Sequence, residues 1–412
     1  MNYVCSSINL CSRIWKSWIA FTHLSFSSLK LQRLIFFRTS KPAAGDCYEM
    51  KELTARICRD YLQGAWKKVN AKNIGFKHIS GGLSNHLFHV SLPDSLKTAD
   101  ANVEHEPKDV LIRVYGQTHG EGALEALITE SVIFTLLSER NLGPKLHGIF
   151  PGGRIEEYID ARPLLTKELS DERLSVSIAK KMAAIHSMEV PLHKAPEWMW
   201  NTLDRWLNSL KNMQLTNMPE STKHILEKVN FGSEIEWLRT RLEGEKSPVV
   251  FCHNDMQVGN ILLPRDAELE NNNEEEPKLV IIDFEYCSYN YRSFDIANHF
   301  LEWVYDYTLK EYPFYSEDHS KYPTEKQRLA FIRAYLRERG SRENPKKILR
   351  EVEVFTLAPH LFWSVWALIN AETSSIPFGY WEFANTRLNS YFQLKQKLSS
   401  QQLKRKMDEL IV

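Results

Sequence analysis

The hydrophobic pattern from about Glu49 onward begins with a helix-like stretch through Leu53–Trp66 and then changes to short alternating segments. Apolar residues recur at every second position through 88–92 and again through 110–115, and this period of two predicts two β-strands. Residues 121–140 instead repeat apolar residues with helical spacing, which predicts an amphipathic helix. Residues 145–159 hold two further apolar stretches, which predict a hairpin. We therefore expect a small mixed sheet with the helix packed on it.

After this β-rich part the pattern becomes mainly helical. Two apolar runs, Val249–Cys252 and Leu279–Ile282, are too short for helices and predict buried strands. The segment 266–278 between them carries three Asn and then three Glu in a row, which predicts a solvated hairpin loop. The pattern as a whole predicts an α+β fold in two lobes. A small β-rich lobe spans residues 50–160, and a larger, mainly helical lobe spans 161–412.

The first 49 residues differ from the rest of the chain. Residues 1–45 contain no Asp or Glu but carry six Lys and Arg, interleaved with serine and apolar residues. Mitochondrial transit segments have this composition, and so do disordered extensions with no targeting role. We therefore leave residues 1–49 out of the fold. The expected location is the cytoplasm, with mitochondrial import as the alternative.

Composition and charge narrow the classes of function. The 52 basic residues balance 52 acidic ones, so the chain lacks the standing positive field of a general nucleic-acid binder. The six cysteines form no Cys-x-x-Cys pair, which argues against a zinc ribbon or a disulfide framework and favours free thiols. We find no window of about 18 uncharged apolar residues and expect no membrane-spanning helix.

The strongest functional signal follows the first short apolar run. His253-Asn254-Asp255 stands directly after it, Asn260 comes five residues after the Asp, and Asp283 ends the second run. Such an Asp can orient and deprotonate a hydroxyl, while an Asn oxygen and a second carboxylate can hold Mg²⁺ on nucleotide phosphates. Each residue alone is more often a turn former, a helix cap or a structural histidine. The combination predicts phosphoryl transfer.

Two features further upstream fit nucleotide binding. The segment Ser80–Asn85 contains paired glycines, which let backbone N–H groups approach phosphates, although a simple hairpin turn is the commoner role. Arg113 faces away from the apolar side of its predicted strand, where it could pair with phosphates. Glu130 on the following helix could hold Arg113 by an ion pair. The alternative for Arg113 is an ordinary surface charge.

These motifs resemble those of the choline/ethanolamine kinase family over roughly residues 50–400. The matching segments are Gly81–Asn85, Leu111–Gly116, Asn141–Leu146, Val249–Leu263, Ile282–Tyr286 and Phe294–Phe300. The resemblance implies a protein-kinase-like fold of two lobes, with ATP between the lobes and Mg²⁺ on its phosphates. It also implies a homodimer. The stretch Gln257-Val258-Gly259 is closer to the choline-type members of the family.

The resemblance implies roles for individual residues. Asp255 is the catalytic base, and Asn260 and Asp283 are both catalytic and metal ligands. The residues implied to bind the nucleotide are Gly81, Gly82, Ser84, Asn85, Arg113, Glu130, Glu157 and Gln257. Glu157 and Tyr158 fall in the segment that meets adenine, and Glu157 stands where relatives often have Gln.

The substrate side of the family also has counterparts in the chain. A quaternary ammonium has no N–H donors, so aromatic faces and a carboxylate hold it best. The candidate substrate-binding residues are Tyr286, Glu302, Tyr307, Trp363, Trp366 and Phe383. Trp363 and Trp366 share a helical face, although paired tryptophans more often pack a core.

A polar stripe lies on the helix that follows Asp295. Helical spacing places five polar side chains on one face, and these are Asp295, Asn298, His299, Glu302 and Asp306. Glu302 and Tyr307 fall on different faces, so they can share a pocket only if it wraps around the end of the helix.

We expect a Mg-ATP-dependent kinase that converts choline to phosphocholine for phosphatidylcholine synthesis, with ethanolamine as a further substrate. An ethanolamine-preferring kinase of the same family is the nearest alternative. A degenerate kinase fold that only binds ligands is the non-enzymatic alternative. A protein kinase is disfavoured, because His253-Asn254-Asp255 and Asp283-Phe284-Glu285 replace the His-Arg-Asp and Asp-Phe-Gly runs of that class.

Overall fold

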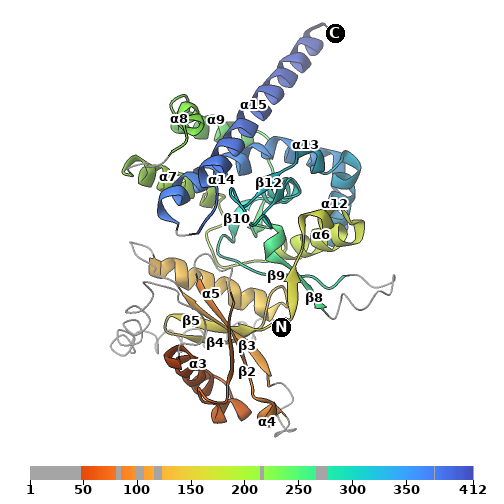
Figure 1. The fold of residues 1–412 in the computed structure, drawn as a ribbon. Helices are drawn as coiled ribbons and strands as arrows, with labels where there is room; N and C mark the ends of the chain where they lie inside the picture. The colour runs from red at the N-terminus through yellow and green to blue at the C-terminus, as the bar shows by residue number, and fades with distance from the viewer. Residues whose placement is uncertain are drawn as a thin grey trace. The chain divides into compact units, whose positions relative to one another are not determined.

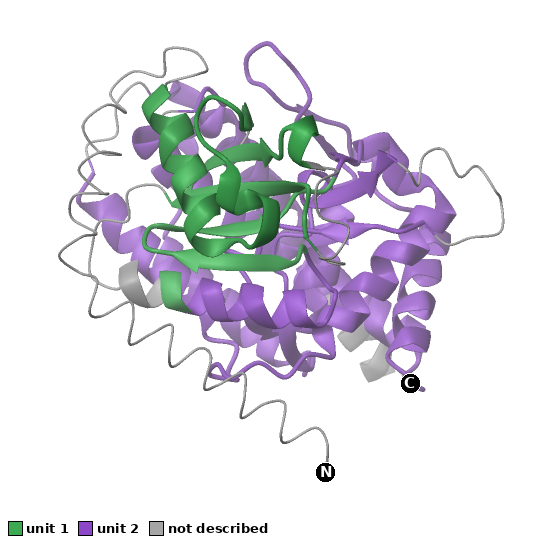
Figure 2. Cartoon of the chain, turned by 90° about the horizontal axis from the view of Figure 1, so that it is seen from below, with its two compact units in different colours: residues 1–128, 144–159 green, residues 129–143, 160–412 purple. Residues whose placement is uncertain are grey.

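The computed structural model describes residues 48–79, 85–97, 106–115, 123–213, 218–265, 277–374 and 376–411. The chain forms two compact units, coloured separately in Figure 2. The first unit runs to Ile128 and takes in Pro144–Ile159, and the second holds Thr129–Gly143 and the chain from Asp160 onward. The predicted leader lies outside the described residues as far as residue 47.

The first unit is built on an antiparallel five-stranded sheet in the order β1-β2-β3-β5-β4 (Figure 1). Its strands are β1 (Gly75–Ile79), β2 (Asn85–Ser91), β3 (Asp109–Tyr115), β4 (Leu146–Phe150) and β5 (Gly153–Glu157). The two alternating segments are thereby confirmed as β2 and β3, and the predicted hairpin is β4–β5. The pattern did not predict β1.

The core of the first unit follows from the alternation along β3. Val110 and Ile112 are fully buried, and they pack in one cluster with residues of α3 (Tyr48–Tyr61) and η1 (Gly64–Lys68). Trp66 of η1 is also fully buried, and its indole N–H donates to the carbonyl of Pro107 at 2.7 Å. That bond satisfies the polar atom of a large apolar side chain, so η1 is fixed against the sheet. The short helix α4 (Asp94–Lys97) follows β2.

The helix predicted over 121–140 is α5 (Ala123–Glu139). The boundary between the two units falls inside it, after Ile128. Its existence is confirmed, and its packing on the sheet stays a prediction.

The second unit is mainly helical, as predicted. Its longer helices are α6 (Glu172–His186), α7 (Trp198–Lys211), α8 (Glu220–Leu226), α9 (Phe231–Glu243), α11 (Arg292–Leu301), α12 (Glu325–Glu338), α13 (Pro345–Phe355), α14 (Leu357–Thr373) and α15 (Tyr380–Ile411). Single helical turns complete it, namely η2 (Thr166–Ser170), η3 (Val258–Asn260) and η4 (His319–Lys321).

Short antiparallel strands position the motif residues of the second unit. The apolar run Val249–Cys252 is β7, which pairs with β10 (Ser288–Tyr291). The second run contains β9 (Val280–Ile281), which pairs with β8 (Ile261–Pro264), and β6 (Ala161–Pro163) pairs with β8 on its other side. A further pair is β11 (Tyr305–Asp306) with β12 (Ser316–Glu317). A hairpin is therefore confirmed across the predicted loop, most of which lies outside the described residues.

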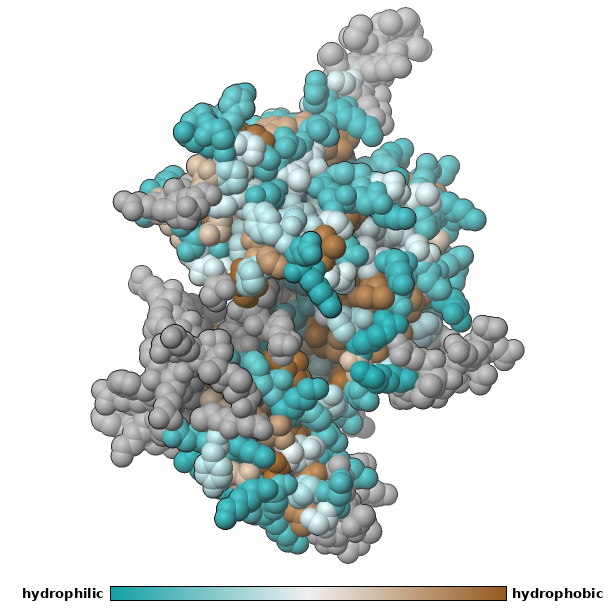
Figure 3. Space-filling model, viewed as in Figure 1, coloured by the Kyte–Doolittle hydropathy of each residue, from teal (hydrophilic) through white to brown (hydrophobic). Residues whose placement is uncertain are grey.

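One helical stretch bears on the expectation that no helix spans a membrane, and that expectation stays a prediction. The continuous helix Pro345–Thr373 is 29 residues long, and an 18-residue window in it has a mean hydropathy of 1.4, so it is long and apolar enough to cross a membrane. Polar residues such as His360, Ser364 and Asn370 interrupt the apolar run of α14, so no 18-residue window there is wholly apolar. Since 83% of the window is buried inside the protein, the helix fits a core role. The face drawn in Figure 3 is mostly hydrophilic.

Candidate active site

The loop that carries His253-Asn254-Asp255 begins directly after β7 and ends in η3. Asn254 adopts a left-handed backbone conformation, with φ at +67°, and Asp283 does the same at +64°. Asn and Asp tolerate this region better than other residues with a Cβ, because their short polar side chains form local hydrogen bonds. Backbone strain of this kind gathers at functional sites.

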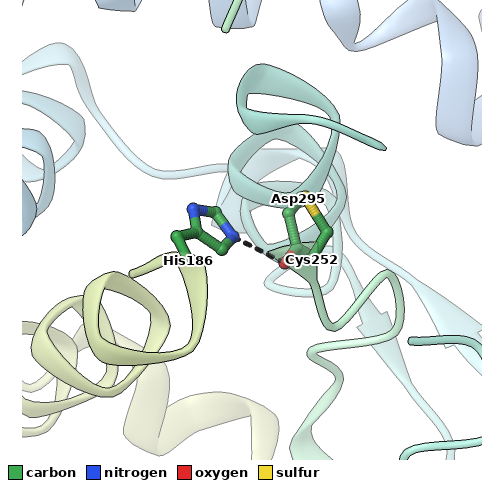
Figure 4. Close-up of side chains that lie close together, drawn as sticks. All are labelled: His186, Cys252 and Asp295. Atoms are coloured by element: carbon green, nitrogen blue, oxygen red, sulfur yellow. Dashed lines mark hydrogen bonds and ion pairs between the residues drawn. The ribbon is translucent and has the colours of Figure 1, made fainter. Parts of the chain in front are cut away.

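Asp295 on α11 holds this loop in place through hydrogen bonds to its backbone. Its two carboxylate oxygens accept the backbone N–H groups of His253 and Asn254, each at 2.9 Å. His186 at the end of α6 bonds to the same carboxylate through Nε2 at 2.9 Å (Figure 4), and the hydroxyl of Tyr335 lies 2.9 Å from its Nδ1. Burial lowers the pKa of His186, so the neutral ring donates to Asp295 and accepts from Tyr335. Burial alone would raise the pKa of Asp295, but these hydrogen bonds outweigh it and hold the pKa below its usual value.

Cys252 lies beside these hydrogen bonds, and its sulfur is within 4.8 Å of the ligand atoms of His186 and Asp295 (Figure 4). The geometry resembles a metal site, but the nitrogens and oxygens already have hydrogen-bond partners. The thiol of Cys252 points at the backbone carbonyls of Asn290 and Tyr291, and burial raises its pKa well above the ordinary value. The cluster is therefore a hydrogen-bonded support of the loop.

Two further side chains of α11 hold the loop. Asn298 donates to the carbonyl of Asn254 at 3.3 Å, and Nδ1 of His299 lies 3.0 Å from the carbonyl of Met256. Together with Asp295 they form the stripe that helical spacing predicted. The sequence analysis assigned this stripe no function, because its partners are backbone groups about 40 residues earlier. The helix ends at Leu301, so the predicted extension of the stripe to Asp306 was wrong, and that residue lies on β11.

The Asp and Asn that lie five residues apart in the sequence meet directly. The side-chain amide of Asn260 donates to the carboxylate and to the backbone carbonyl of Asp255, both at 3.0 Å. Burial raises the pKa of Asp255 well above its ordinary value, and the nearby charges of Glu302, Asp283 and Glu285 raise it further. Several carboxylates thus crowd around Asp255. Glu285 is a member of this group that the sequence analysis did not single out.

The backbone next to Asp283 is tied to the same loop. The N–H of Ile282 donates to the carbonyl of Asn260, and Nε2 of His253 lies 3.0 Å from the carbonyl of Ile282. Because β8 and β9 pair, Asn260 just before β8 and Asp283 just past β9 lie at the same end of the hairpin. His253 therefore has a structural role, which was the alternative to a catalytic role in the sequence analysis.

His299 makes stability sensitive to acid. Burial lowers its pKa from 6.5 to about 4. The unfolded chain therefore takes up the proton at a higher pH than the folded protein, so stability is lost as the pH falls from about 6.5 towards 4. When the pH is lowered from 7 to 5, we expect the free energy of unfolding of His299→Gln to fall by about 2 kcal/mol less than that of wild type. Urea unfolding at the two pH values measures this, with the exposed His193→Gln as control, and equal pH dependence in wild type and His299→Gln would contradict it.

An aromatic cluster in the second unit gathers most of the predicted substrate residues. The ring of Trp363 lies 5.6 Å from that of Tyr286 and 5.7 Å from that of Trp366, both edge-to-face. Trp366 in turn lies 5.7 Å from Tyr380, which the sequence analysis missed. The indole N–H of Trp363 donates to Asn298 at 2.8 Å, so the cluster is tied to the helix that supports the loop.

The cluster continues to the remaining predicted residues. Phe378, also missed, lies 5.0 Å from Tyr380, 5.5 Å from Phe383 and 6.4 Å from Tyr307. Glu302 caps the end of α11 and is 3% exposed. Burial raises the pKa of its carboxylate, against the opposing effects of the charge of Arg387 and the hydroxyl of the neighbouring Tyr307. The chain turns after Leu301, so Glu302 and Tyr307 come together around the helix end.

The predicted nucleotide residues are only partly covered by the structure. Gly81, Gly82 and Ser84 lie outside the described residues, and Asn85 begins β2. Gln257 caps η3, where its side-chain oxygen accepts the N–H of Gly259.

Arg113 is buried rather than a surface charge. Its Nε donates to Glu156 at 2.7 Å, and Arg154 donates to the same oxygen at 2.7 Å. Glu156 was not predicted and is the carboxylate that orients Arg113 within the first unit. Glu130 belongs to the second unit, so its pairing with Arg113 stays a prediction.

The segment predicted to meet adenine also has defined contacts. The carboxylate of Glu157 at the end of β5 accepts the N–H of Lys145 at 3.0 Å. The ring of Tyr158 stacks on His89 with centroids 3.6 Å apart. Both contacts lie within the first unit.

A family model described as "Choline/ethanolamine kinase" matches residues 76–392. The chain belongs to the choline/ethanolamine kinase family. It is 46% identical over 352 residues to a human choline/ethanolamine kinase, covering 83% of this chain and 86% of the relative. It is 43% identical over 370 residues to mouse choline kinase alpha, covering 83% of this chain and 80% of the relative.

Solved structures place this chain in the predicted fold class. A choline kinase from Cryptosporidium parvum superposes with a TM-score of 0.68 at 30% identity, covering 85% of this chain and 96% of that one. A putative aminoglycoside phosphotransferase from Ralstonia eutropha shares the fold alone, with a TM-score of 0.51 at 14% identity. The protein-kinase-like fold is confirmed, and the chain is a kinase with ATP as its phosphate donor.

Proposed function

We propose that this kinase transfers the γ-phosphoryl group of ATP to the hydroxyl of choline, and less efficiently to that of ethanolamine. Phosphocholine made in this way enters phospholipid synthesis. The proposal rests on the second unit, where a catalytic loop and a cluster of aromatic side chains with a buried carboxylate lie together.

The closeness of these two parts carries the proposal. Glu302 raises the pKa of Asp255, so the two carboxylates lie within electrostatic reach of one another. Trp363 is hydrogen-bonded to Asn298, which donates to the loop carbonyl of Asn254. An ammonium held by the aromatic faces and Glu302 would present a hydroxyl two carbons away towards Asp255. A short amino alcohol is therefore the acceptor that we propose.

The chemical step assigns a role to Asp255. The oxygen of the alcohol forms a bond to the γ-phosphorus, the bond from that phosphorus to the bridging oxygen breaks, and ADP leaves with the electron pair. The proton of the hydroxyl passes to Asp255, which orients the nucleophile through this proton. Asn260 keeps the carboxylate in place by its hydrogen bond at 3.0 Å. Arg113, oriented by Glu156, is the proposed phosphate contact of the first unit.

The donor set around Asp255 fits Mg²⁺. The pKa of Asp255 is raised by burial and by the charges of neighbouring carboxylates, which a divalent cation would neutralise. The amide nitrogen of Asn260 donates to Asp255, which leaves the side-chain carbonyl oxygen as a ligand of the kind that a hard cation prefers. We assign Asn260 and Asp283 as its ligands. When bound, Mg²⁺ neutralises charge on the transferred phosphoryl group.

The preference for choline follows from two properties of its trimethylammonium group, which is easier to desolvate than a primary ammonium and has no N–H donors. Three methyl groups spread the charge of choline and remove every N–H, so this ion loses less hydration when it is buried. A primary ammonium instead requires several directed acceptors. Rings of the cluster provide π faces, each worth about 0.5 to 2 kcal/mol to a bound cation. Glu302 attracts both alcohols by its charge.

Replacing Trp366 tests this preference. Trp366→Ala is expected to raise the KM for choline about tenfold, because one cation–π contact is lost, with a smaller change for ethanolamine and none for ATP. The measurement is steady-state kinetics with each alcohol. Trp237→Ala is the matched control, because Trp237 also packs against a cation, Lys395 at 4.1 Å, but lies on α9 outside the cluster. Equal effects on both alcohols would contradict the aromatic argument.

Cytoplasmic location and homodimeric assembly stay predictions that rest on the sequence. The described cysteines, Cys58, Cys252 and Cys287, are free and buried, which supports a reducing compartment.

A further inference from the structure

Arg387 on α15 is a buried cation next to the proposed ammonium site. It is 1% exposed, and its Nη2 donates to Oε1 of Glu302 at 3.1 Å. The centre of its guanidinium lies 3.9 Å from the ring centroid of Tyr305 and 4.8 Å from that of Phe383. The sequence analysis did not single out Arg387, because 85 residues separate it from Glu302.

The ion pair between Arg387 and Glu302 is only half satisfied. Within the described part of the chain, Oε2 of Glu302 and Nε and Nη1 of Arg387 are buried without a hydrogen-bond partner. Buried polar atoms normally find partners, and a purely structural ion pair is strongest when the planar guanidinium engages both carboxylate oxygens. Here the guanidinium lies over the rings of Tyr305 and Phe383 and engages one oxygen. The other oxygen of this buried carboxylate has the Tyr307 hydroxyl as a neighbour but makes no hydrogen bond within the described residues.

We propose that Arg387 is a specificity-determining positioning residue, which holds Oε1 of Glu302 so that Oε2 alone meets the ammonium of the amino alcohol. This inference rests on the proposed function. A single acceptor is sufficient for a trimethylammonium, which donates no hydrogen bond. A primary ammonium has three N–H donors and loses more when only one carboxylate oxygen faces it. Arg387 therefore biases the kinase towards choline without touching the substrate.

The charge of Arg387 acts in the same direction. With Arg387 in place, the pair carries no net charge, so the aromatic faces contribute a larger share of the attraction for the substrate. A diffuse cation gains most of its binding from such faces, whereas a compact ammonium gains most from a concentrated negative charge. Removal of the guanidinium returns the second oxygen and the full charge of Glu302 to the substrate.

The test is the ratio of kcat/KM for choline to that for ethanolamine. We expect Arg387→Met to lower this ratio about tenfold, the size of one charge-assisted hydrogen bond gained by ethanolamine. The KM for ATP should stay unchanged. The double variant Glu302→Gln with Arg387→Met should have the same ratio as Glu302→Gln alone, because Arg387 acts through the carboxylate of Glu302. Arg387→Lys keeps the charge and should restore most of the wild-type ratio.

Arg328→Met provides the matched control. Arg328 on α12 likewise pairs with a glutamate, Glu353 at 3.0 Å, and lies over a tyrosine ring, Tyr322 at 5.4 Å, but outside the aromatic cluster. It should leave the ratio unchanged. If Arg387→Met does not fold, Arg387→Lys provides the test instead. We then expect the ratio of kcat/KM for choline to that for ethanolamine to be two- to threefold lower than in wild type, which corresponds to about 0.5 kcal/mol for one weakened contact.

Three results separate this inference from the proposed function. A wild-type protein that phosphorylates choline, together with folded Arg387 variants at the wild-type ratio, would overturn the role of Arg387 alone. An equal loss from Arg387→Met with and without Glu302 would do the same. A folded wild type with activity on neither alcohol would instead overturn the proposed function.

Discussion

The variant Asp255→Asn is expected to retain the fold and lose about three orders of magnitude or more in kcat, because the base that orients and accepts the proton of the hydroxyl is gone. Asparagine keeps the volume and can still bond to Asn260, which holds the wild-type carboxylate at 3.0 Å. The loop itself is fixed mainly through the backbone N–H groups that Asp295 accepts. Rates of ADP release with saturating choline measure the effect.

The variant Asp171→Asn is the matched control for Asp255→Asn. Asp171 caps α6 and accepts two backbone N–H groups there, a role that asparagine performs about equally well. Asp171→Asn should therefore keep wild-type kcat and thermal stability. A folded Asp255→Asn protein with near-normal turnover would show that Asp255 is not the base.

Asp283→Ala is expected to abolish Mg²⁺-dependent turnover to a similar extent, about a thousandfold, because the metal that neutralises the phosphates loses a ligand. A second readout is independent of turnover. The affinity for ATP, measured by calorimetry with and without Mg²⁺, should depend on the metal in wild type and lose that dependence in the variant. The backbone strain at Asp283, with φ at +64°, makes Asp283→Asn a useful second variant, since asparagine tolerates this conformation.

The control for Asp283 is Asp318→Asn. Asp318 lies at the exposed start of η4, where it accepts the N–H of Ser320 at 3.0 Å. Its exchange should change neither turnover nor the effect of Mg²⁺ on ATP binding. Unchanged Mg²⁺ dependence in folded Asp283→Asn would remove Asp283 from the set of ligands.

The sequence predicted the parts of the site that are local along the chain. Asp255 and Asn260 lie five residues apart, so their meeting across one loop follows from spacing alone. The strand before the loop could be predicted because Val249–Cys252 is a continuous apolar run with no room for a helix. The fold class followed from the change of hydrophobic period between the two parts of the chain, and the family's motifs strengthened it.

The parts that sequence could not predict depend on distant partners. Asn298 and Trp363 are 65 residues apart, and Glu302 and Arg387 are 85 apart. Their chemistry is visible in the sequence, but tertiary packing alone selects the partner. Tyr380 and Phe378 were not predicted for the same reason, since aromatic residues more often fill a core.

The polar stripe of α11 could be predicted from the sequence only in part. Its spacing predicted that Asp295, Asn298 and His299 share a face. Nothing in the sequence indicated that this face would meet backbone groups, because a polar helical face is usually solvated. Full burial of these three side chains is the observation that assigns them to the loop.

The most direct test of the central claim is a phosphate-transfer assay of the full chain with ATP and Mg²⁺ against choline, ethanolamine, an aminoglycoside and a serine-containing peptide. Phosphorylated products are identified by ³¹P NMR, and kcat/KM is compared between acceptors. We predict phosphocholine as the main product, phosphoethanolamine at lower efficiency, and no product from the aminoglycoside or the peptide. Higher efficiency with ethanolamine would contradict the aromatic account of specificity, and ATP turnover with none of the amino alcohols would contradict the proposed function itself.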